Sequence, residues 1–383
     1  MDTSIRQPTA EHPANVTSHD VARAAGVSQS TVSRVLRGDP RVAAATRERV
    51  LAAVDAMGYV PSDVGRSLST RSTRSIAIVV TDLSNVFYPY LIAPLHQETS
   101  AQNYRMVLFT EEVEPLVEGN QSQAPAGEDE ISPLLDRLLN RSMDGVILTT
   151  SRLDSSVPKV LSRRGMPFVF LTRLVEGVAA DSAVVDNSLG ASLATSEALR
   201  LGHQRFGAIF GPSDTSTGRD RERGTRAALA AAGVELPDRM VRHSPFTYQS
   251  GYRAMVDLMA ENPRPTVVIC ANDLVAIGAF NATNTLGLRV PDDVSIVGFD
   301  DLPMAAWQVF DLTTVRQPME EMAKTAVRLL IDRIEGRTES SATRQIVFEP
   351  QLVMRGTLAP PPAGGATETA RSDPPAQQLT TSP

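Results

Sequence analysis

Apolar and polar side chains recur at helical spacing in the segment VARAAGVSQSTVSRVL, residues 21–36. Gly26 provides the small residue of a tight turn, and Ser28 can cap a second helix that follows it. Val32 and Val35 fall on the inner side of that helix, so its polar residues face outward. Two short helices around a tight turn, the second with exposed hydrogen-bonding groups, meet the requirements of a helix-turn-helix. The segment therefore predicts contact with base edges in the major groove of DNA.

Carboxylates and a thiol offer the chemistry that an enzyme or a metal site would use. Asp300 and Asp301 are adjacent, but neighbours at a strand end point in different directions, and no nucleophile and base motif accompanies them. Cys270 lies in the apolar run TVVICAND, which favours a buried structural thiol over a reactive one. With one cysteine and five scattered histidines, we predict no catalytic residue, no metal site and no cofactor. A sugar-processing enzyme is the catalytic alternative, and turnover of a candidate sugar would revive it.

The elements that position these residues fall into two classes. Residues 17–58 fit three short helices, the first capped by Thr17 or Ser18 and the last stopped by Gly58. From Ile76 onward, short apolar or β-branched runs alternate with amphipathic helical patterns; the runs are IAIVV, YRMVLFT, GVILTT, PFVFLT, SAVVD, RFGAIFG, TVVICA and VSIVGF. This alternation predicts doubly wound parallel sheets. The expected fold class is an N-terminal all-α helix-turn-helix head with a hinge, followed by a two-lobed α/β core.

Composition places the boundaries of these parts. Residues 1–15 and 358–383 are polar or rich in proline, alanine, threonine and serine, which predicts disordered tails. The expected bounds are 16–60 for the helix-turn-helix head, 61–74 for the hinge and 75–357 for the core, with an extended surface loop over 111–130. Within the core, we expect lobe 1 at about 75–177 and 308–337, and lobe 2 at about 178–307 and 338–357.

Charge is distributed unevenly along the chain. Residues 1–75 hold ten arginines against seven aspartates and glutamates, a balance of +3, so with a total of −7 the remainder carries −10. A basic head on an acidic body suits a protein that touches DNA at one end. No apolar run reaches the ~18 residues of a membrane span, and residues 1–20 lack a signal-peptide core. We therefore expect a cytoplasmic protein without membrane contact, which disfavours a secreted solute-binding protein.

Several short motifs occur together along most of the chain. The head contains Ala25-Gly26-Val27-Ser28, Thr31-Val32-Ser33-Arg34-Val35-Leu36 and Gly58-Tyr59-Val60-Pro61, and the core contains Val185-Asp186-Asn187, Ala271-Asn272-Asp273 and Val297-Gly298-Phe299-Asp300-Asp301. In this combination, the chain resembles the lactose-repressor (LacI) family, and its core resembles the type I periplasmic sugar-binding fold. The resemblance implies a DNA-binding transcriptional repressor controlled allosterically by a small-molecule effector, a sugar or sugar derivative, bound between the two core lobes.

The same resemblance assigns roles in the head by position. It places base-edge contacts at Gln29, Ser30 and Arg34, and the chemistry agrees because Arg pairs bidentately with guanine and Gln with adenine. It implies phosphate contacts at Thr17, Ser28, Thr31 and Ser33. Leu68 occupies the position of the minor-groove wedge that bends the operator, although Gly65 interrupts the alanine-rich hinge helix of the family. The alternative for the helix residues is that they are solvated residues of a small helical bundle. The alternative for Leu68 is that it is an ordinary linker leucine.

In the core, the resemblance implies a ligand site at the carboxyl ends of the strands. Its expected contacts are Asp82, Asn85, Phe87, Arg173, Thr217, Arg221, Phe246, Asn272, Asp300 and Gln317. Thr172 is an alternative to Arg173, and Tyr88 and Trp307 are alternatives to Phe87 as the aromatic that stacks on a sugar. Structural roles compete at each position, and His203 is expected to be a structural hydrogen-bonder. Where the family often has Asp-Arg, this chain has Thr172-Arg173, which removes one acceptor.

The resemblance also implies the partners of the protein. Two identical heads match a palindromic operator, so we expect a homodimer or a dimer of dimers. The sign of the allosteric effect stays open, because both an inducer and a co-repressor are compatible with the sequence.

Overall fold

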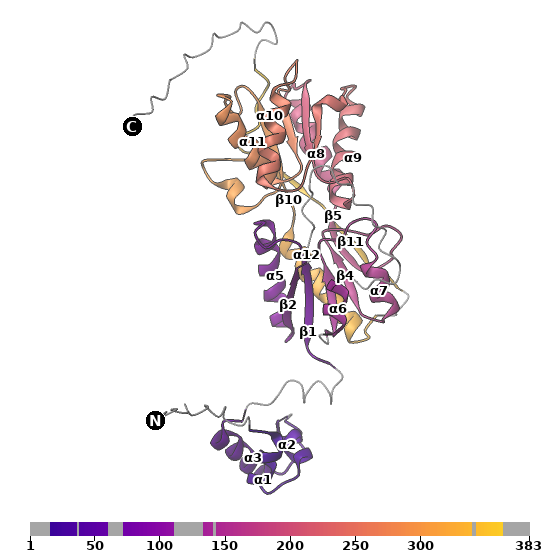
Figure 1. The fold of residues 1–383 in the computed structure, drawn as a ribbon, viewed down its shortest axis with the longest axis vertical. Coiled ribbons are helices and arrows are strands. Elements are labelled where there is room, and N and C mark those ends of the chain that lie inside the picture. Colours follow the sequence, from indigo (N-terminus) through magenta and orange to yellow (C-terminus); the bar gives the residue numbers. More distant parts are fainter. Residues whose placement is uncertain are drawn as a thin grey trace, which may run out of the picture. The chain divides into compact units, whose positions relative to one another are not determined.

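The computed structural model describes residues 16–36, 38–59, 72–110, 133–140, 143–338 and 342–362. The chain divides into two compact units, residues 1–73 and residues 74–383, which are called here the head and the core (Figure 1). The predicted tail over 1–15, the loop over 111–130 and the hinge positions Gly65 and Leu68 lie outside the described residues. None of the helices in the described ranges combines the length and the apolar character that crossing a membrane requires.

The head consists of three helices, as the sequence predicts. They are α1 (Ser18–Ala24), α2 (Gln29–Leu36) and α3 (Ala44–Met57). Thr17 caps α1 through a capping box with Asp20, and Gly58 ends α3 in the left-handed conformation that glycine adopts without strain. The three helices pack around a small core of Val21, Ala22, Ala25, Val32, Val35 and Val50.

Lobe 1 of the core is built on a parallel sheet with strand order β11-β5-β4-β3-β1-β2. Its strands are β1 (Ser75–Val80), β2 (Arg105–Thr110), β3 (Gly145–Leu148), β4 (Phe168–Leu171), β5 (Ser182–Val185) and β11 (Gln345–Phe348). Its helices are α5 (Phe87–Ala101), α6 (Pro133–Asn140), α7 (Val157–Arg163) and α12 (Met319–Ile334). Alternate residues of β1 enter opposite faces: Ile76 and Ile78 pack in one apolar cluster, and Ala77 and Val79 in another. The sheet is therefore covered on both faces.

Lobe 2 has a second sheet, with strand order β12-β10-β9-β8-β6-β7. Its strands are β6 (Phe206–Phe210), β7 (Val241–His243), β8 (Val267–Cys270), β9 (Ser295–Asp300), β10 (Thr314–Arg316) and β12 (Gln351–Val353), of which β12 alone runs antiparallel to its neighbour. Its helices are α8 (Asn187–Arg200), α9 (Ser216–Ala231), α10 (Tyr248–Met259) and α11 (Asp273–Thr285), with short 3₁₀ turns at Asp238–Met240 and Pro303–Ala306 (Figure 1).

The strands correct the expected lobe boundaries. The strand β5 lies in the sheet of lobe 1 and not in lobe 2, β10 lies in lobe 2 and not in lobe 1, and β11 returns to lobe 1. The chain therefore crosses between the lobes after β5, after β10 and after β11. Hydrophobic periodicity identifies a strand, but the neighbours to which it hydrogen-bonds decide its sheet, so the pattern alone misplaced these three strands.

The end of the core extends further than composition predicts. Leu358 is buried, and the backbone N–H of Ala359 donates to Ser295 Oγ at 3.2 Å. The carbonyl of Ala359 accepts from Nε2 of buried His203 at 2.8 Å, which confirms the structural role of that histidine. Leu358 and Ala359 therefore belong to the core and not to the predicted tail, because they complete the packing of lobe 2. Cys270 is also buried, as predicted.

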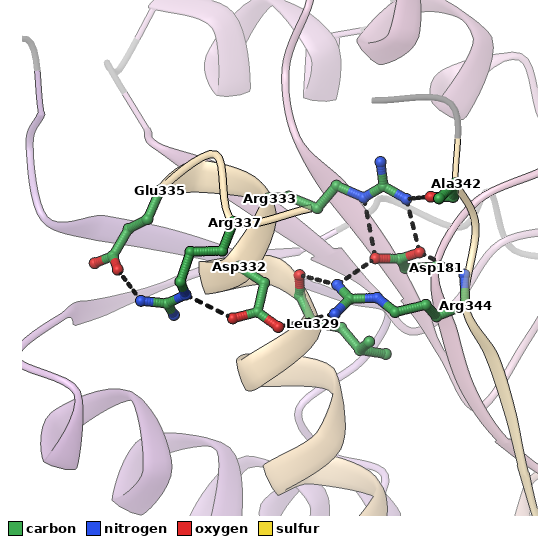
Figure 2. A network of polar contacts seen from close by, with 8 residues as sticks. All are labelled: Asp181, Leu329, Asp332, Arg333, Glu335, Arg337, Ala342 and Arg344. Carbon is green, nitrogen blue, oxygen red and sulfur yellow. Dashed lines mark hydrogen bonds and ion pairs between the residues drawn. The ribbon is translucent and has the colours of Figure 1, made fainter. Parts of the chain in front are cut away.

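A buried carboxylate joins three segments of lobe 1 (Figure 2). Asp181 precedes β5 and is fully buried; it accepts from Arg333 of α12 at 2.8 and 3.0 Å and from Arg344, which precedes β11, at 2.9 Å. Burial alone would raise the pKa of Asp181, but the hydrogen bonds from the two arginines hold that pKa below its usual value. These contacts fasten α12 to the beginnings of β5 and β11.

Candidate functional site

The outer side of α2 carries the predicted base-contact residues. Gln29, Ser30 and Arg34 are exposed, whereas Val32 and Val35 are buried in the core of the head. Because the two valines fix the rotation of α2, its polar side is held toward solvent in one orientation. The helix therefore presents an amide, a hydroxyl and a guanidinium on one short surface.

Hydroxyl groups gather at the amino end of α2. Ser28 Oγ lies 2.8 Å from Ser30 Oγ and 2.9 Å from Thr31 Oγ1, and it accepts from the backbone N–H of Thr31 at 3.2 Å. Hydroxyls and amides at a helix amino end suit a phosphate group. Thr17 differs, because its hydroxyl caps α1 and donates to Asp20 at 2.6 Å. Ser33 is partly buried on α2.

The core contains a cavity of about 420 Å³, part of it open to solvent, lined from both lobes. The lining residues are Asn85, Phe87, Tyr88, Thr149, Thr172, Arg173, Thr217, Arg221, Phe246, Asn272, Asp300 and Gln317. Every predicted ligand residue except Asp82 is in this set, together with the alternatives Thr172 and Tyr88. Thr149 is an addition that the sequence did not indicate.

The topology of the two sheets explains why these residues meet. Thr149, Thr172 and Asp300 lie at the carboxyl ends of β3, β4 and β9. Asn272 follows β8 and caps α11, where its side chain accepts from the N–H of Val275 at 3.0 Å. Parallel strands bring their carboxyl ends to one edge of a sheet, and the two lobes face each other across these edges. The cavity is the expected ligand position for this fold.

Asp82 and Trp307, which the sequence offered for the site, lie outside the lining of the cavity. Asp82 is exposed, and its carboxylate accepts from the N–H and the hydroxyl of Ser84 at 2.8 and 2.6 Å. These local bonds satisfy Asp82 within its own turn and lower its pKa. Trp307 is 56% exposed and stacks on Phe310, outside the lining of the cavity.

Arg221 is the most constrained side chain of the cavity. It is buried, and its Nε, Nη1 and Nη2 donate respectively to Asn187 Oδ1 at 2.8 Å, to the carbonyl of Ala271 at 2.6 Å and to Asp300 Oδ1 at 3.4 Å. Its guanidinium carbon lies 3.6 Å from the centroid of the Phe299 ring. All three nitrogens and one face are thus occupied, which fixes the group in place.

Asp300 faces Arg221 from the end of β9. It is buried and has a φ of 124°, a region that side chains rarely adopt, and Gln317 Nε2 donates to its Oδ1 at 2.6 Å. Burial raises the pKa of Asp300 to about 6, although Arg221 and Gln317 act in the opposite direction. Asp301 instead pairs with Arg316 and Arg355 at 2.6 Å each, so the two adjacent carboxylates point to different partners, as predicted.

Sequence reasoning missed the residues that support this arrangement. Asp273 is fully buried at the start of α11, where it accepts from the hydroxyl of Thr314 and from the N–H of Leu302, the latter at 2.7 Å. Burial raises the pKa of Asp273 well above its usual value. It holds the turn that follows Asp300. The motif around Asn272 was recognised, but the role of its neighbour depends on tertiary contacts.

Phe246 closes one side of the cavity. Asn85 Nδ2 of lobe 1 donates to its carbonyl at 3.3 Å, and the Arg173 guanidinium of lobe 1 lies 5.4 Å from its ring centroid. The ring packs on Gly211, where an added Cβ would overlap the ring atoms. Gly211 therefore makes the space in which Phe246 reaches the cavity.

Lobes 1 and 2 also meet beside the cavity, in a group of four charged residues called here the inter-lobe clasp: Arg152, Asp214, Glu176 and Arg219. Arg152 of lobe 1 pairs with Asp214 of lobe 2 at 2.7 Å, and Glu176 of lobe 1 pairs with Arg219 of lobe 2. The N–H of Leu153 donates to the carbonyl of Asp214 at 2.8 Å. The clasp holds the lobes together without using a residue of the cavity lining.

Comparison with known proteins identifies both parts of the chain. Residues 17–62 match the model described as bacterial regulatory proteins, lacI family, and residues 195–358 match a periplasmic binding protein-like domain. The HTH-type transcriptional regulator CelR of Thermobifida fusca is 34% identical over 88% of this chain and 96% of its own length. The ribose operon repressor of Haemophilus influenzae is 32% identical over 89% of this chain and 98% of its own length.

Solved structures agree with these relatives. A CelR–cellobiose complex is 33% identical, covers 89% of this chain and 99% of its own, and gives a TM-score of 0.65. The lac repressor dimer bound to operator and the anti-inducer ONPF is 26% identical, covers 90% of this chain and 99% of its own, and gives a TM-score of 0.78. With its helix-turn-helix head and two-lobed core, the chain belongs to the lacI family of bacterial regulatory proteins and is a DNA-binding transcriptional regulator.

Proposed function

We propose that this regulator is a repressor that binds a palindromic operator as a homodimer and responds to a sugar or sugar derivative in its cavity. The observation that carries the proposal is the cavity itself, lined from both lobes around the buried Arg221 and Asp300. Among the relatives, CelR has been solved with cellobiose and the lac repressor as a dimer on its operator. These relatives support the same two partners for this chain.

The lining of the cavity has the chemistry of a carbohydrate site. Asn85, Asn272, Gln317 and Asp300 offer directional hydrogen bonds to hydroxyl groups. Phe87 and Tyr88 line the same space with their rings 5.5 Å apart in an edge-to-face arrangement, and Phe246 lies on the opposite lobe. Aromatic faces pack well on the apolar faces of sugar rings. A polyhydroxylated ligand fits both features.

The effector would act by changing how the two lobes close around the cavity. A ligand that contacts lining residues of both lobes stabilises one closure of the cavity over others, and the three crossings carry that preference through the core. The resulting coupling between effector and DNA typically amounts to about 1–3 kcal/mol. We propose no sign for this coupling, because an inducer and a co-repressor would use the same cavity.

On the DNA side, Gln29, Ser30 and Arg34 read base edges in the major groove. Thr17, Ser28, Thr31 and Ser33 orient the head on phosphates. Leu68, which lies outside the described residues, would supply the minor-groove wedge. Exposure of Gln29, Ser30 and Arg34 on α2 supports the base contacts, and the group of hydroxyls at the amino end of α2 supports the phosphate contacts.

The experiment compares Arg34→Ala with Arg49→Ala, which removes the same charge from the exposed side of α3. Full-length protein is titrated at fixed salt with two DNA duplexes of equal length. One is the genomic fragment from upstream of the regulator's own gene, and the other has a scrambled sequence. Loss of a bidentate base contact costs about 1–3 kcal/mol, so Arg34→Ala should reduce the preference for the genomic fragment by about 5- to 150-fold. Arg49→Ala should leave the ratio unchanged. An unchanged ratio in Arg34→Ala would contradict the base-reading assignment.

A further inference from the structure

We propose that the effector carries an acidic group, a carboxylate or a phosphate, that pairs with Arg173. This inference rests on the proposed function, because it names the chemical class of the molecule that binds the cavity. It starts from the charges that line the cavity. The lining contains two guanidinium groups, Arg173 and Arg221, and one carboxylate, Asp300; the other lining side chains are neutral.

Asp300 is already matched by Arg221. The two groups form a buried ion pair at 3.4 Å, and Nε and Nη1 of Arg221 donate to Asn187 and to the carbonyl of Ala271. These bonds and the Phe299 ring, 3.6 Å from the guanidinium carbon, hold Arg221 against Asp300. Since Asp300 is the one carboxylate of the lining and pairs with Arg221, the lining carries one net positive charge, and Arg173 is its guanidinium without an ion pair among the described residues.

Arg173 has no carboxylate partner among the described residues. Its Nη1 donates to the carbonyl of Thr150 at 3.1 Å, and its guanidinium packs over Phe246 at 5.4 Å. The nearest acid along the chain, Glu176, pairs with Arg219 in the inter-lobe clasp. Thr172, beside it, is neutral and donates its hydroxyl to the carbonyl of Thr149 at 3.0 Å.

The stacking of Arg173 on Phe246 leaves its recognition chemistry available. An arginine that packs one face on an aromatic ring keeps N–H donors in the guanidinium plane, where carboxylates and phosphates bind in a bidentate manner. Arg173 is partly buried and lines the cavity, so water satisfies its charge less well than at an open surface. An anionic group on the ligand would supply the missing partner.

The rest of the lining defines the remainder of that ligand. The aromatic rings and neutral hydrogen-bonding groups suit a hydroxylated ring, so the inferred class is a sugar acid or a sugar phosphate. A carboxylate and a phosphate share the chemistry that Arg173 recognises, and the binding experiment separates them.

The test uses full-length protein and matched sugars in calorimetry and thermal-shift titrations. One set contains glucose, glucuronate, gluconate and glucose 6-phosphate, and a second contains galactose, galacturonate and galactose 6-phosphate. A charge-assisted bidentate contact predicts that the acidic member of a set binds at least about tenfold tighter than its neutral parent. Preference for the uronates or for the phosphates identifies the acidic group.

Two variants and a control assign the effect to Arg173. Arg173→Gln should abolish the preference for the acidic sugar while changing affinity for the neutral parent by less than about threefold, and Arg173→Lys should keep part of the preference because it keeps the charge. Arg164→Gln, which removes an exposed charge at the end of α7, should bind as wild type does. Arg173→Lys also keeps the test decisive if the glutamine variant folds poorly.

The outcomes separate the inference from the proposed function. If neutral sugars bind as tightly as their acids, or if Arg173→Gln leaves the preference intact, the acidic effector is wrong and the sugar effector stands. If neither neutral nor acidic sugars bind, both are contradicted.

Discussion

Arg221 of α9 donates from Nε to Oδ1 of Asn187 at 2.8 Å, which joins the cavity to the first residue of α8. Asn187 follows the crossing that leaves β5, and its own Nδ2 donates to the carbonyl of Val185 at 3.3 Å. The buried side-chain amide of Asn187 therefore links β5 of lobe 1 to Arg221, which lines the cavity from lobe 2. This link positions Arg221 relative to the crossing.

Asn187→Ala should weaken effector binding without preventing folding. The substitution removes the acceptor that holds Nε of Arg221, so the guanidinium is no longer fixed in the cavity, and effector affinity should fall about tenfold, or about 1.4 kcal/mol. Asn281→Ala removes a comparable hydrogen bond, to the hydroxyl of Tyr248 at 2.7 Å, away from the cavity lining. Calorimetry on both variants measures the difference. Equal effector affinity in the two would show that Asn187 does not position Arg221.

Gly211→Ala should displace Phe246 from the cavity. The new Cβ would overlap the ring, which is partly exposed and can turn toward solvent. Effector affinity should therefore fall at least fivefold while the melting temperature of the free protein changes little. A thermal-shift titration reports both quantities. Wild-type affinity in this variant would mean that the ring contributes nothing to binding.

The sequence predicted the elements better than their partners. Buried runs such as IAIVV and TVVICA became strands, and Thr17 capped α1, because periodicity and capping are local properties. Arg221 and Asp300 were predicted by position in family motifs, and both line the cavity. Asn187 and Gly211 were not predicted as part of the site, since their roles depend on contacts between segments far apart in sequence. Asp82 was predicted to contact the ligand but does not line the cavity. Its carboxylate accepts from Ser84 in its own turn, a local contact that the family position did not indicate.

The inter-lobe clasp should set how readily the cavity closes. Asp214→Asn breaks the ion pair with Arg152 across the lobes, whereas Asp154→Asn breaks a pair of the same arginine within lobe 1. Partly exposed pairs contribute up to about 1 kcal/mol, so Asp214→Asn should lower effector affinity about two- to fivefold and reduce its dependence on salt. Asp154→Asn should bind as wild type does. A larger effect from Asp154→Asn would refute the role of the clasp.

Asp181, which contacts Arg333 and Arg344 in Figure 2, should stabilise the core in a pH-dependent way. Asp181→Asn leaves Arg333 and Arg344 without their shared carboxylate and should cost about 3 kcal/mol at pH 7. Because the folded protein holds the pKa of Asp181 below its ordinary value, this stability is fully present above the unfolded pKa, about 4, and is lost progressively as the pH falls from there through the lower folded pKa. Urea unfolding from pH 7 to pH 3.5 measures the effect.

The more exposed Asp332 provides the control for that measurement. It also pairs with Arg344, at 2.8 Å, so Asp332→Asn removes a carboxylate from the same network. Since it is only partly buried, its loss should cost less than half as much as the loss of Asp181. A difference between wild type and Asp181→Asn that does not shrink below pH 4 would contradict the assignment.

The most direct test of the whole account measures DNA affinity with and without effector. Fluorescence anisotropy of a labelled fragment from upstream of the regulator's own gene is followed with full-length protein, alone and with the sugar that gives the largest thermal shift. We predict selective binding over scrambled DNA and a change of about 5- to 150-fold in that affinity on adding the sugar, in either direction. Equal affinity for genomic and scrambled duplexes, with and without every sugar tried, would contradict a DNA reader controlled by a ligand.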